Sequence, residues 1–98
     1  MSDELRFDAL LMSPVRLGVI SVLMTRKHAT FSDLRQLLEL TQGNLTIHLQ
    51  KIEQAAYIKI KKEFVKKRPR TTLSITAKGR SAFLRHLEIL NSIPDQDD

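Results

Sequence analysis

The 98-residue sequence contains no cysteine, so it has no disulfide framework, no zinc cluster with thiolate ligands and no cysteine nucleophile. Long hydrophobic runs are also missing. The longest, Leu17 to Met24, is interrupted by Gly18 and Ser21 and is far shorter than the ~18 residues of a membrane span. The opening MSDELR is acidic and lacks the apolar region of a signal peptide. We therefore expect an intracellular, cytoplasmic protein that does not enter a membrane.

Catalytic signatures are missing as well: there is no Gly-rich phosphate loop, no G-x-S-x-G and no H-E-x-x-H. His28, His48 and His86 are scattered along the chain. His86 and Glu88 are two residues apart in a segment with helical spacing, so they lie on different helix faces and are poorly placed to share a metal ion. The sequence predicts no enzyme, no cofactor and no metal site.

Composition indicates one small folded domain. Hydrophobic residues make up 42% of the chain and charged residues 28%, a balance too apolar for a disordered chain. A chain of this size buries only about two-thirds of its unfolded surface, so its stability is low and a partner subunit would add to it. We expect a single domain over residues 1–92 and a disordered acidic tail over residues 93–98.

Positive charge is concentrated in one segment. Between Lys59 and Arg80 there are nine basic residues against the single acid Glu63, a net charge of +8. The other 76 residues carry seven basic and ten acidic side chains, a net charge of −3. A basic stripe on a mildly acidic body is typical of proteins that bind nucleic acid. A solvated lysine-rich hairpin has the same charge pattern, and charge alone does not decide between them.

Apolar residues recur at helical spacing in five segments. The predicted helices cover Leu5–Met12, Pro14 to about Thr25, a segment that follows Ser32 as N-cap, a segment from Thr41 as N-cap to about Ala55, and Ala77–Asn91 with Thr76 as N-cap. The residues predicted to face the core are Leu17, Ile20 and Met24 flanked by Val19 and Leu23, then Leu34, Leu37 and Leu38, then Leu45, Leu49 and Ile52. Two short helices joined by a three-residue turn indicate a helix-turn-helix.

Apolar residues alternate with polar ones from Tyr57 to Ile75, which predicts a two-stranded hairpin. Thr30 and Phe31 could add a short edge strand. The predicted tip, Phe64 to Arg70, is almost wholly cationic, and Phe64 and Val65 are expected to cover the base of the hairpin.

The segments TFSDLRQLLEL, TQGNLTIHLQKIEQAAYI and FVKKRPRTTLSITAKGR resemble the helix-turn-helix and wing of MarR/ArsR-like winged helix-turn-helix regulators. The resemblance extends from Ser13 to Arg80. It implies an α+β winged helix-turn-helix fold and a double-stranded DNA-binding regulator of transcription. The family pattern has glycine after the recognition helix, where this chain has Ala56. Because a left-handed alanine is strained, we expect the helix to end differently here.

In that fold the outer face of the helix at about 42–55 would read bases in the major groove. Its candidate DNA-binding residues are Gln42, Gly43, Asn44, Thr46, Ile47, Gln50 and Lys51. Amide side chains can pair with adenine, and Thr and Ile can contact a thymine methyl group. The wing, at about 57–75, would contact the phosphate backbone or the minor groove through Lys66, Lys67, Arg68 and Arg70. Alternatively, these are ordinary solvated positions of an amphipathic helix and hairpin.

The last predicted helix carries more apolar surface than one small core requires. Phe83, Leu87 and Leu90 form a stripe, with Leu84, Ile89 and Ile93 beside it. Together with Leu5 and Phe7, this surface predicts a homodimer through the terminal helices, an arrangement that the family resemblance also implies. The alternatives in other classes are a winged-helix protein-interaction module and a non-specific architectural DNA binder.

Overall fold

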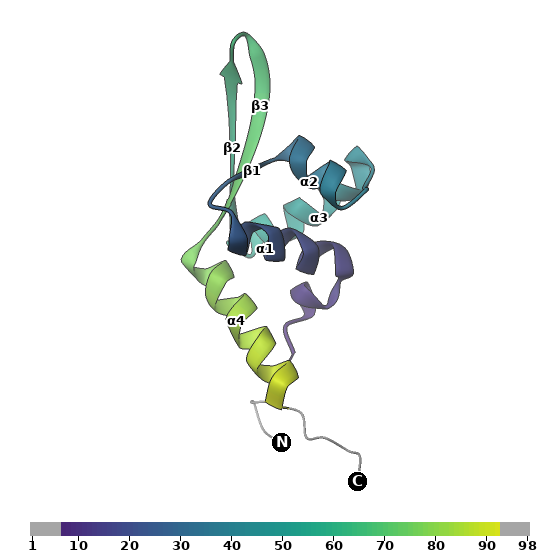
Figure 1. Cartoon of the computed structure of the whole chain (residues 1–98), viewed down its shortest axis with the longest axis vertical. Coiled ribbons are helices and arrows are strands. Elements are labelled where there is room, and N and C mark those ends of the chain that lie inside the picture. The colour runs from purple at the N-terminus through teal and green to yellow at the C-terminus, as the bar shows by residue number, and fades with distance from the viewer. Residues whose placement is uncertain (1–6, 93–98) are drawn as a thin grey trace.

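The computed structural model describes residues 7–92. In chain order these form the 3-10 helix η2 (Ala9–Met12), α1 (Pro14–Thr25), β1 (Ala29–Thr30), α2 (Phe31–Leu37), α3 (Gln42–Gln54), β2 (Ile58–Val65), β3 (Arg68–Ile75) and α4 (Ala77–Ser92). The strands form one antiparallel sheet in the order β1-β3-β2. Figure 1 shows β2 and β3 projecting as a long hairpin from one end of the helical body, with α4 at the other end. This architecture confirms the predicted α+β winged helix-turn-helix fold.

Polar caps start the helices. Ser13 Oγ accepts from Arg16 N, with Pro14 in the first turn, and Thr41 Oγ1 accepts from Asn44 N. The predicted N-cap of α2, Ser32, is wrong. Thr30 caps that helix instead, because Thr30 and Asp33 bond each other's backbone N–H groups in a capping box.

The predicted helix over Leu5–Met12 is much shorter in the described part of the chain. Only η2 forms there, and Asp8 caps it by accepting from Leu10 N. Ser13 is extended (ψ 128°) because the residue before a proline is biased away from helical geometry. Leu5, Ile93 and the predicted acidic tail lie outside the described residues.

The core lies between the helices and the inner half of the sheet. Its fully buried side chains are Leu11, Val19, Ile20, Leu23, Leu34, Leu45, Ile52 and Leu73. The predicted inward face of α3 is confirmed. On α1 all five predicted residues contact the core, but the flanking Val19 and Leu23 are buried more deeply than Leu17 and Met24. Leu37, predicted to face the core, is 51% exposed because it lies in the last turn of a seven-residue helix.

The hairpin lies where it was predicted, but its strands extend further into the predicted tip and its turn is tighter. Pairing continues from Ile58↔Ile75 outward to Val65↔Arg68, so only Lys66 and Lys67 form the turn. Both turn residues have positive φ, 52° and 65°, which is the conformation of a type I′ hairpin turn. The outer half of the hairpin lies beyond the core, so Phe64 is 78% exposed and does not cover the hairpin base as predicted.

Helix α3 ends in a left-handed residue, Ala56, contrary to the expectation that an alanine would avoid this conformation. Ala56 has φ 66°, its N–H donates to Glu53 O at 2.8 Å, and Tyr57 N donates to Ile52 O at 2.9 Å. These two bonds define a Schellman motif. The chain therefore has the helix ending that is usually formed by glycine, with the strain of a left-handed alanine.

Helix α4 starts directly against this helix end. Thr76 N donates to Tyr57 O at 3.0 Å, and the Thr76 hydroxyl donates to Ala56 O at 2.6 Å and accepts from Gly79 N at 2.9 Å. Gly79 packs so closely on Tyr57 that a Cβ there would lie 2.2 Å from the Tyr57 carbonyl oxygen. We call the four residues Ala56, Tyr57, Thr76 and Gly79 the junction. Within residues 7–92, no helix is both long and apolar enough to cross a membrane.

Replacing Ala56 with glycine should raise the free energy of unfolding by about 1 kcal/mol, because glycine adopts the left-handed conformation without strain. Ala55 is the matched control. It has right-handed geometry (φ −81°), so Ala55→Gly should lower stability by about 0.5–1 kcal/mol. Urea unfolding of both variants measures the difference, and a destabilised Ala56→Gly protein would contradict the assignment.

Gly79→Ala should lower the free energy of unfolding by about 1–3 kcal/mol, because the new methyl group meets a backbone carbonyl that no side-chain rotation can move. Gly43→Ala is the control, since nothing lies within 4 Å of a Cβ at that helical position. The control should be neutral or more stable, as alanine is the better helix former. Thermal unfolding of the two variants tests this, and equal melting temperatures would argue against the close approach.

Candidate nucleic-acid interface

The outward face of α3 carries most of the predicted base-reading residues. Six of the seven are exposed: Gln42, Gly43, Asn44, Ile47, Gln50 and Lys51. Thr46 is half-buried, and its hydroxyl donates to Gln42 O at 2.8 Å. That bond occupies the hydroxyl proton of Thr46, which leaves its methyl group and oxygen lone pairs for a ligand.

Gln54 belongs to the same face, although the sequence analysis did not single it out. It is exposed and lies one helical turn beyond Gln50, which itself follows Gly43 and Ile47 on the side away from the core. The signal that could have found it is this spacing of three to four residues. The outward row of α3 is therefore about three turns of small, apolar and amide side chains.

A groove of about 530 Å³ separates α3 from the wing. It is lined by Phe31, Gln42, Thr46, Leu49, Gln50, Glu53, Ile60, Lys62 and Thr71. Gln42 and Gln50 thus face the wing across the groove, and Lys62 faces α3. Glu53 is an acid in this wall and its exposed carboxylate disfavours a phosphate close to it, so an approaching DNA backbone would meet Lys62 more favourably.

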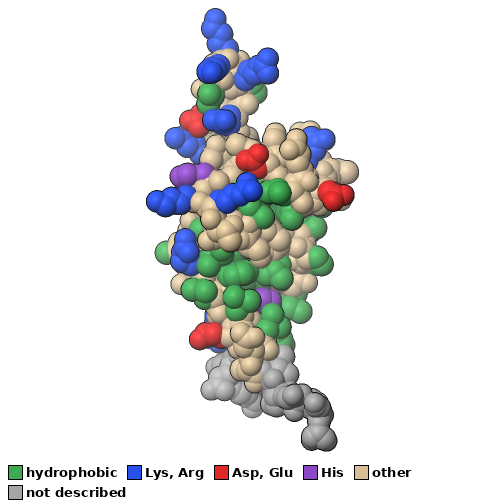
Figure 2. Space-filling model, in the orientation of Figure 1, with side chains coloured by type: hydrophobic (Ala, Val, Ile, Leu, Met, Phe, Trp, Pro, Cys, Tyr) green, Lys and Arg blue, Asp and Glu red, His purple; other side chains and the backbone are tan. Residues whose placement is uncertain are grey.

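The predicted cations of the wing are all exposed: Lys66, Lys67, Arg68 and Arg70. Figure 2 shows Lys and Arg side chains gathered at the outer end of the hairpin. The prediction placed all four in a loop at the tip, but only the two lysines occupy the turn, and the arginines project from β3. The only acid in the hairpin, Glu63, pairs in register with Arg70 and has its Oε1 3.6 Å from Lys61 Nζ.

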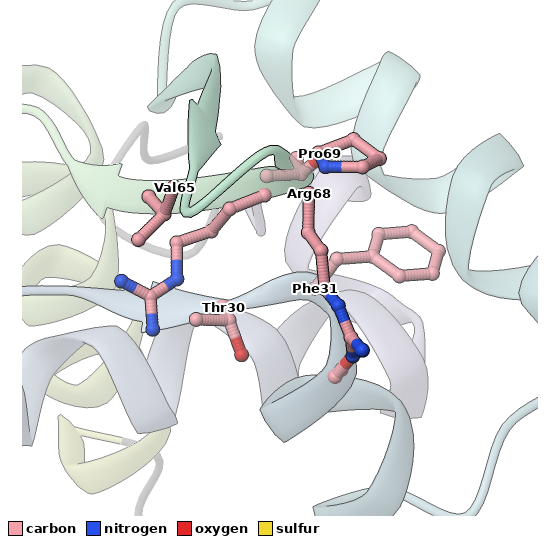
Figure 3. A pocket seen from close by; sticks show the side chains of 8 residues that line it. Thr30, Phe31, Val65, Arg68 and Pro69 are labelled. Carbon is pink, nitrogen blue, oxygen red and sulfur yellow. The ribbon is translucent and has the colours of Figure 1, made fainter.

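A second groove of about 530 Å³ runs along the edge of β3. Figure 3 shows Val65, Arg68 and Pro69 of the wing on one side and Thr30 and Phe31 on the other. The groove exists because β1 pairs with β3 only as far as Thr72, which leaves the outer part of the β3 edge open. Arg68 and Arg70 both line this groove, which makes it the more cationic of the two.

His48 connects α3 to α1 and η2 through Arg16, a contact that was not predicted from the sequence. Arg16 Nη1 lies 3.0 Å from His48 Nδ1, while Arg16 Nε donates to Leu10 O at 2.7 Å. Burial, and then the positive charges of Arg16 and Lys51, lower the pKa of His48. The imidazole is therefore neutral, with Nδ1 as acceptor and the proton on Nε2. Arg16 thereby links η2, α1 and the recognition helix.

The other histidines lie away from this interface. His28 is exposed, and His86 is buried in α4 with its ring edge-on to Phe7. Within residues 7–92, no three histidine, aspartate or glutamate side chains come together as a metal site. Nearby, the Tyr57 hydroxyl donates to Asp8, and burial together with this bond raises the pKa of Tyr57 to about 12.

Comparison with known proteins places this geometry in a family. A family model described as a winged helix DNA-binding domain matches residues 15–93. An uncharacterized protein of Methanocaldococcus jannaschii is 39% identical over 79 residues, which span 80% of this chain and 86% of the relative. The solved structure of a transcriptional regulator homologue from Pyrococcus horikoshii OT3 is 36% identical, with a TM-score of 0.83 over 92% of this chain and 89% of that one.

A more distant structure, that of reduced AbfR bound to DNA, has the same fold at 20% identity, with a TM-score of 0.70 over 91% of this chain and 66% of that one. The family match covers the helix-turn-helix, the wing and α4, and the structural match extends over nearly the whole described chain. The resemblance predicted from the sequence is confirmed. The chain belongs to the family of winged helix DNA-binding domains.

Proposed function

We propose that this protein is a sequence-specific regulator of transcription that binds double-stranded DNA as a homodimer and is not an enzyme. Helix α3 lies in the major groove and the wing lies on the neighbouring backbone or minor groove. The observation that carries this proposal is the placement of an exposed amide-rich helix face and a cationic hairpin on the two sides of one groove. The Pyrococcus relative is described as a transcriptional regulator homologue, and AbfR binds DNA in its solved structure.

Helix α3 and the wing contribute differently to DNA recognition. The major groove is wide enough for an α-helix, and base edges there distinguish all four base pairs. Amide groups such as Asn44 and Gln50 supply the paired donor and acceptor that adenine requires. Lys66, Lys67 and Arg68 supply charge without base specificity, so they fix the position of the protein on the duplex.

A salt titration separates these roles. Lys67→Ala should weaken binding to every duplex to a similar degree and lower the slope of log affinity against log salt by about 1, since one phosphate contact is lost. Gln50→Ala should cost about 1–3 kcal/mol on a duplex selected from a random pool while barely changing affinity for a scrambled duplex. Fluorescence anisotropy on both duplexes measures these changes.

Gln36→Ala is the matched control for Gln50, because Gln36 is an exposed glutamine on α2 rather than on the outward face of α3. It should leave discrimination between the two duplexes intact. An equal loss of affinity for both duplexes in Gln50→Ala, or an unchanged salt slope in Lys67→Ala, would contradict these separate roles of α3 and the wing. Equal wild-type affinity for selected and scrambled duplexes would instead indicate a non-specific architectural protein.

The proposed dimer uses the apolar surface of α4. Leu84, Leu87 and Leu90 are 49%, 40% and 46% exposed and form a stripe along one side of the helix. Phe83, predicted as part of the stripe, and Ile89, predicted beside it, pack on their own chain instead. Figure 2 shows hydrophobic side chains gathered over the half of the molecule that contains α4. A second copy that covers the leucine stripe would remove it from water.

Leu87→Glu should convert a dimer into a monomer, because a carboxylate in an apolar seam is desolvated without a partner. Leu37→Glu is the matched control, since Leu37 is a similarly exposed leucine, at 51%, on α2. Sedimentation equilibrium at micromolar concentration distinguishes the two states. A wild-type monomer with undiminished DNA affinity, or a dimer that persists in Leu87→Glu, would rule out this seam. If the seam is correct, the preferred site is pseudo-palindromic, with half-sites about one helical turn apart.

A further inference from the structure

Phe64 is the most exposed large hydrophobic side chain in residues 7–92, at 78%, compared with 59% for Met12, the next in order. It lies one residue before the last pair of the hairpin, among the cations of the wing. Burying a phenylalanine side chain stabilises a protein by about 1.5–3 kcal/mol, and an exposed one does not provide this stabilisation. Nothing in the described part of the fold covers this ring, so a partner that covers it is the first explanation to seek.

Phe64 points to the side of the wing that faces α3. Side chains alternate between the two faces of a strand, so Phe64 shares its face with Ile60 and Lys62. Their register partners on β3 are Leu73 for Ile60, Thr71 for Lys62 and Pro69 for Phe64. Ile60, Lys62 and Thr71 line the groove against α3. Phe64 therefore continues this wall of the groove outward, and Pro69, which also lines the groove along the β3 edge, lies beside it.

The pair is rigid and closely packed. With a two-residue turn, Val65 and Arg68 form the hydrogen-bonded pair next to the turn, and Phe64 and Pro69 form the following pair without such bonds. In a pair of this kind the Cα atoms are only about 4.5 Å apart and the side chains are adjacent. The missing N–H of Pro69 removes no ladder bond, since that side of β3 is the open edge beyond Thr72.

The charges around the pair decide which partner fits. Lys62 is on the same face, and Lys66, Lys67, Arg68 and Arg70 surround the outer end. A second copy of this wing would bring like charges together, which is unfavourable. A duplex instead offers phosphates to the cations and stacked bases to the ring. Apolar side chains that enter the minor groove between base steps unstack them and kink DNA by about 20–90°.

We propose that Phe64, held from the side by Pro69, is an apolar wedge that enters the minor groove of the bound duplex, partly unstacks one base step and bends the DNA. This inference rests on the proposed DNA binding and adds a specificity element to it. Pyrimidine–purine steps such as TpA are the most easily unstacked. The wedge therefore favours TpA at one defined step in each half-site, at a position that no hydrogen-bonding side chain reads.

The test uses the full-length protein and a duplex selected from a random pool, labelled at its two ends for energy transfer. Binding of the wild type should shorten the distance between the two labelled ends of the duplex. The Phe64→Ala variant should bind the duplex without bending it. Phe64→Leu should retain a bend, because leucine also serves as a wedge. Val65→Ala is the matched control, since it removes an apolar side chain from the opposite face of the wing, next to Phe64. It should bend DNA as the wild type does.

A second measurement replaces each flanking TpA step in turn with GpC. The wild type should lose about tenfold in affinity at a single step per half-site, within the usual cost of changing one base pair, and Phe64→Ala should show no sensitive step. An unbent wild-type complex, or a bend and a step preference that survive in Phe64→Ala, would overturn the wedge alone. Absence of duplex binding by the wild type would remove the proposed function and the wedge together. A change in the sedimentation of the free protein on Phe64→Ala would assign Phe64 to a protein contact instead.

Discussion

The arrangement of the whole molecule depends on the junction at the end of α3. Two residues after that helix end the chain turns through the left-handed Ala56, and two residues later it enters β2 at Ile58. The carbonyl groups of Ala56 and Tyr57 also accept hydrogen bonds from Thr76, the residue just before α4. Wing and terminal helix are thereby anchored to one short piece of backbone. Because Gly79 packs directly on the Tyr57 carbonyl group, the direction of α4 is set by backbone contacts rather than by flexible side chains. In the proposed dimer, the same contacts would set the spacing of the two α3 helices.

Strained, left-handed backbone conformations occur where α2 and α3 end and where the wing turns. The four residues with positive φ among those described are Glu39, Ala56, Lys66 and Lys67, and none of them is glycine. Gly18 and Gly79 instead lie where a Cβ would meet a neighbour at 3.1 Å and 2.2 Å. The left-handed residues end α2 and α3 and form the turn of the wing. Each such residue costs about 1–2 kcal/mol in a small domain with little stability to spare.

Local patterns of the sequence were enough to predict the fold. The caps Ser13, Thr41 and Thr76 and the apolar spacing of α3 follow from interactions within four residues, and they were found correctly. One error is local, since the cap of α2 is Thr30, bonded to Asp33, and not Ser32. Other errors concern features that depend on more distant parts of the chain. The burial of Leu37 depends on where α2 ends, and the length of the wing depends on a register that continues past the core. The Arg16–His48 contact joins residues 32 positions apart, which no local spacing can indicate.

The outer wing is the part of the molecule whose sequence the fold itself does not explain. Three features weaken an isolated hairpin: the backbone strain of the left-handed Lys66 and Lys67, the repulsion between Arg68 and Arg70, and the exposure of Phe64 to water. Asn-Gly at the turn and polar residues on β2 would suit the free hairpin better. A bound DNA duplex would remove two of these unfavourable effects, because its phosphates neutralise the cations and its minor groove covers the Phe64 ring. The wing sequence is thus the one expected if its stability is set in the DNA-bound state rather than in the free protein.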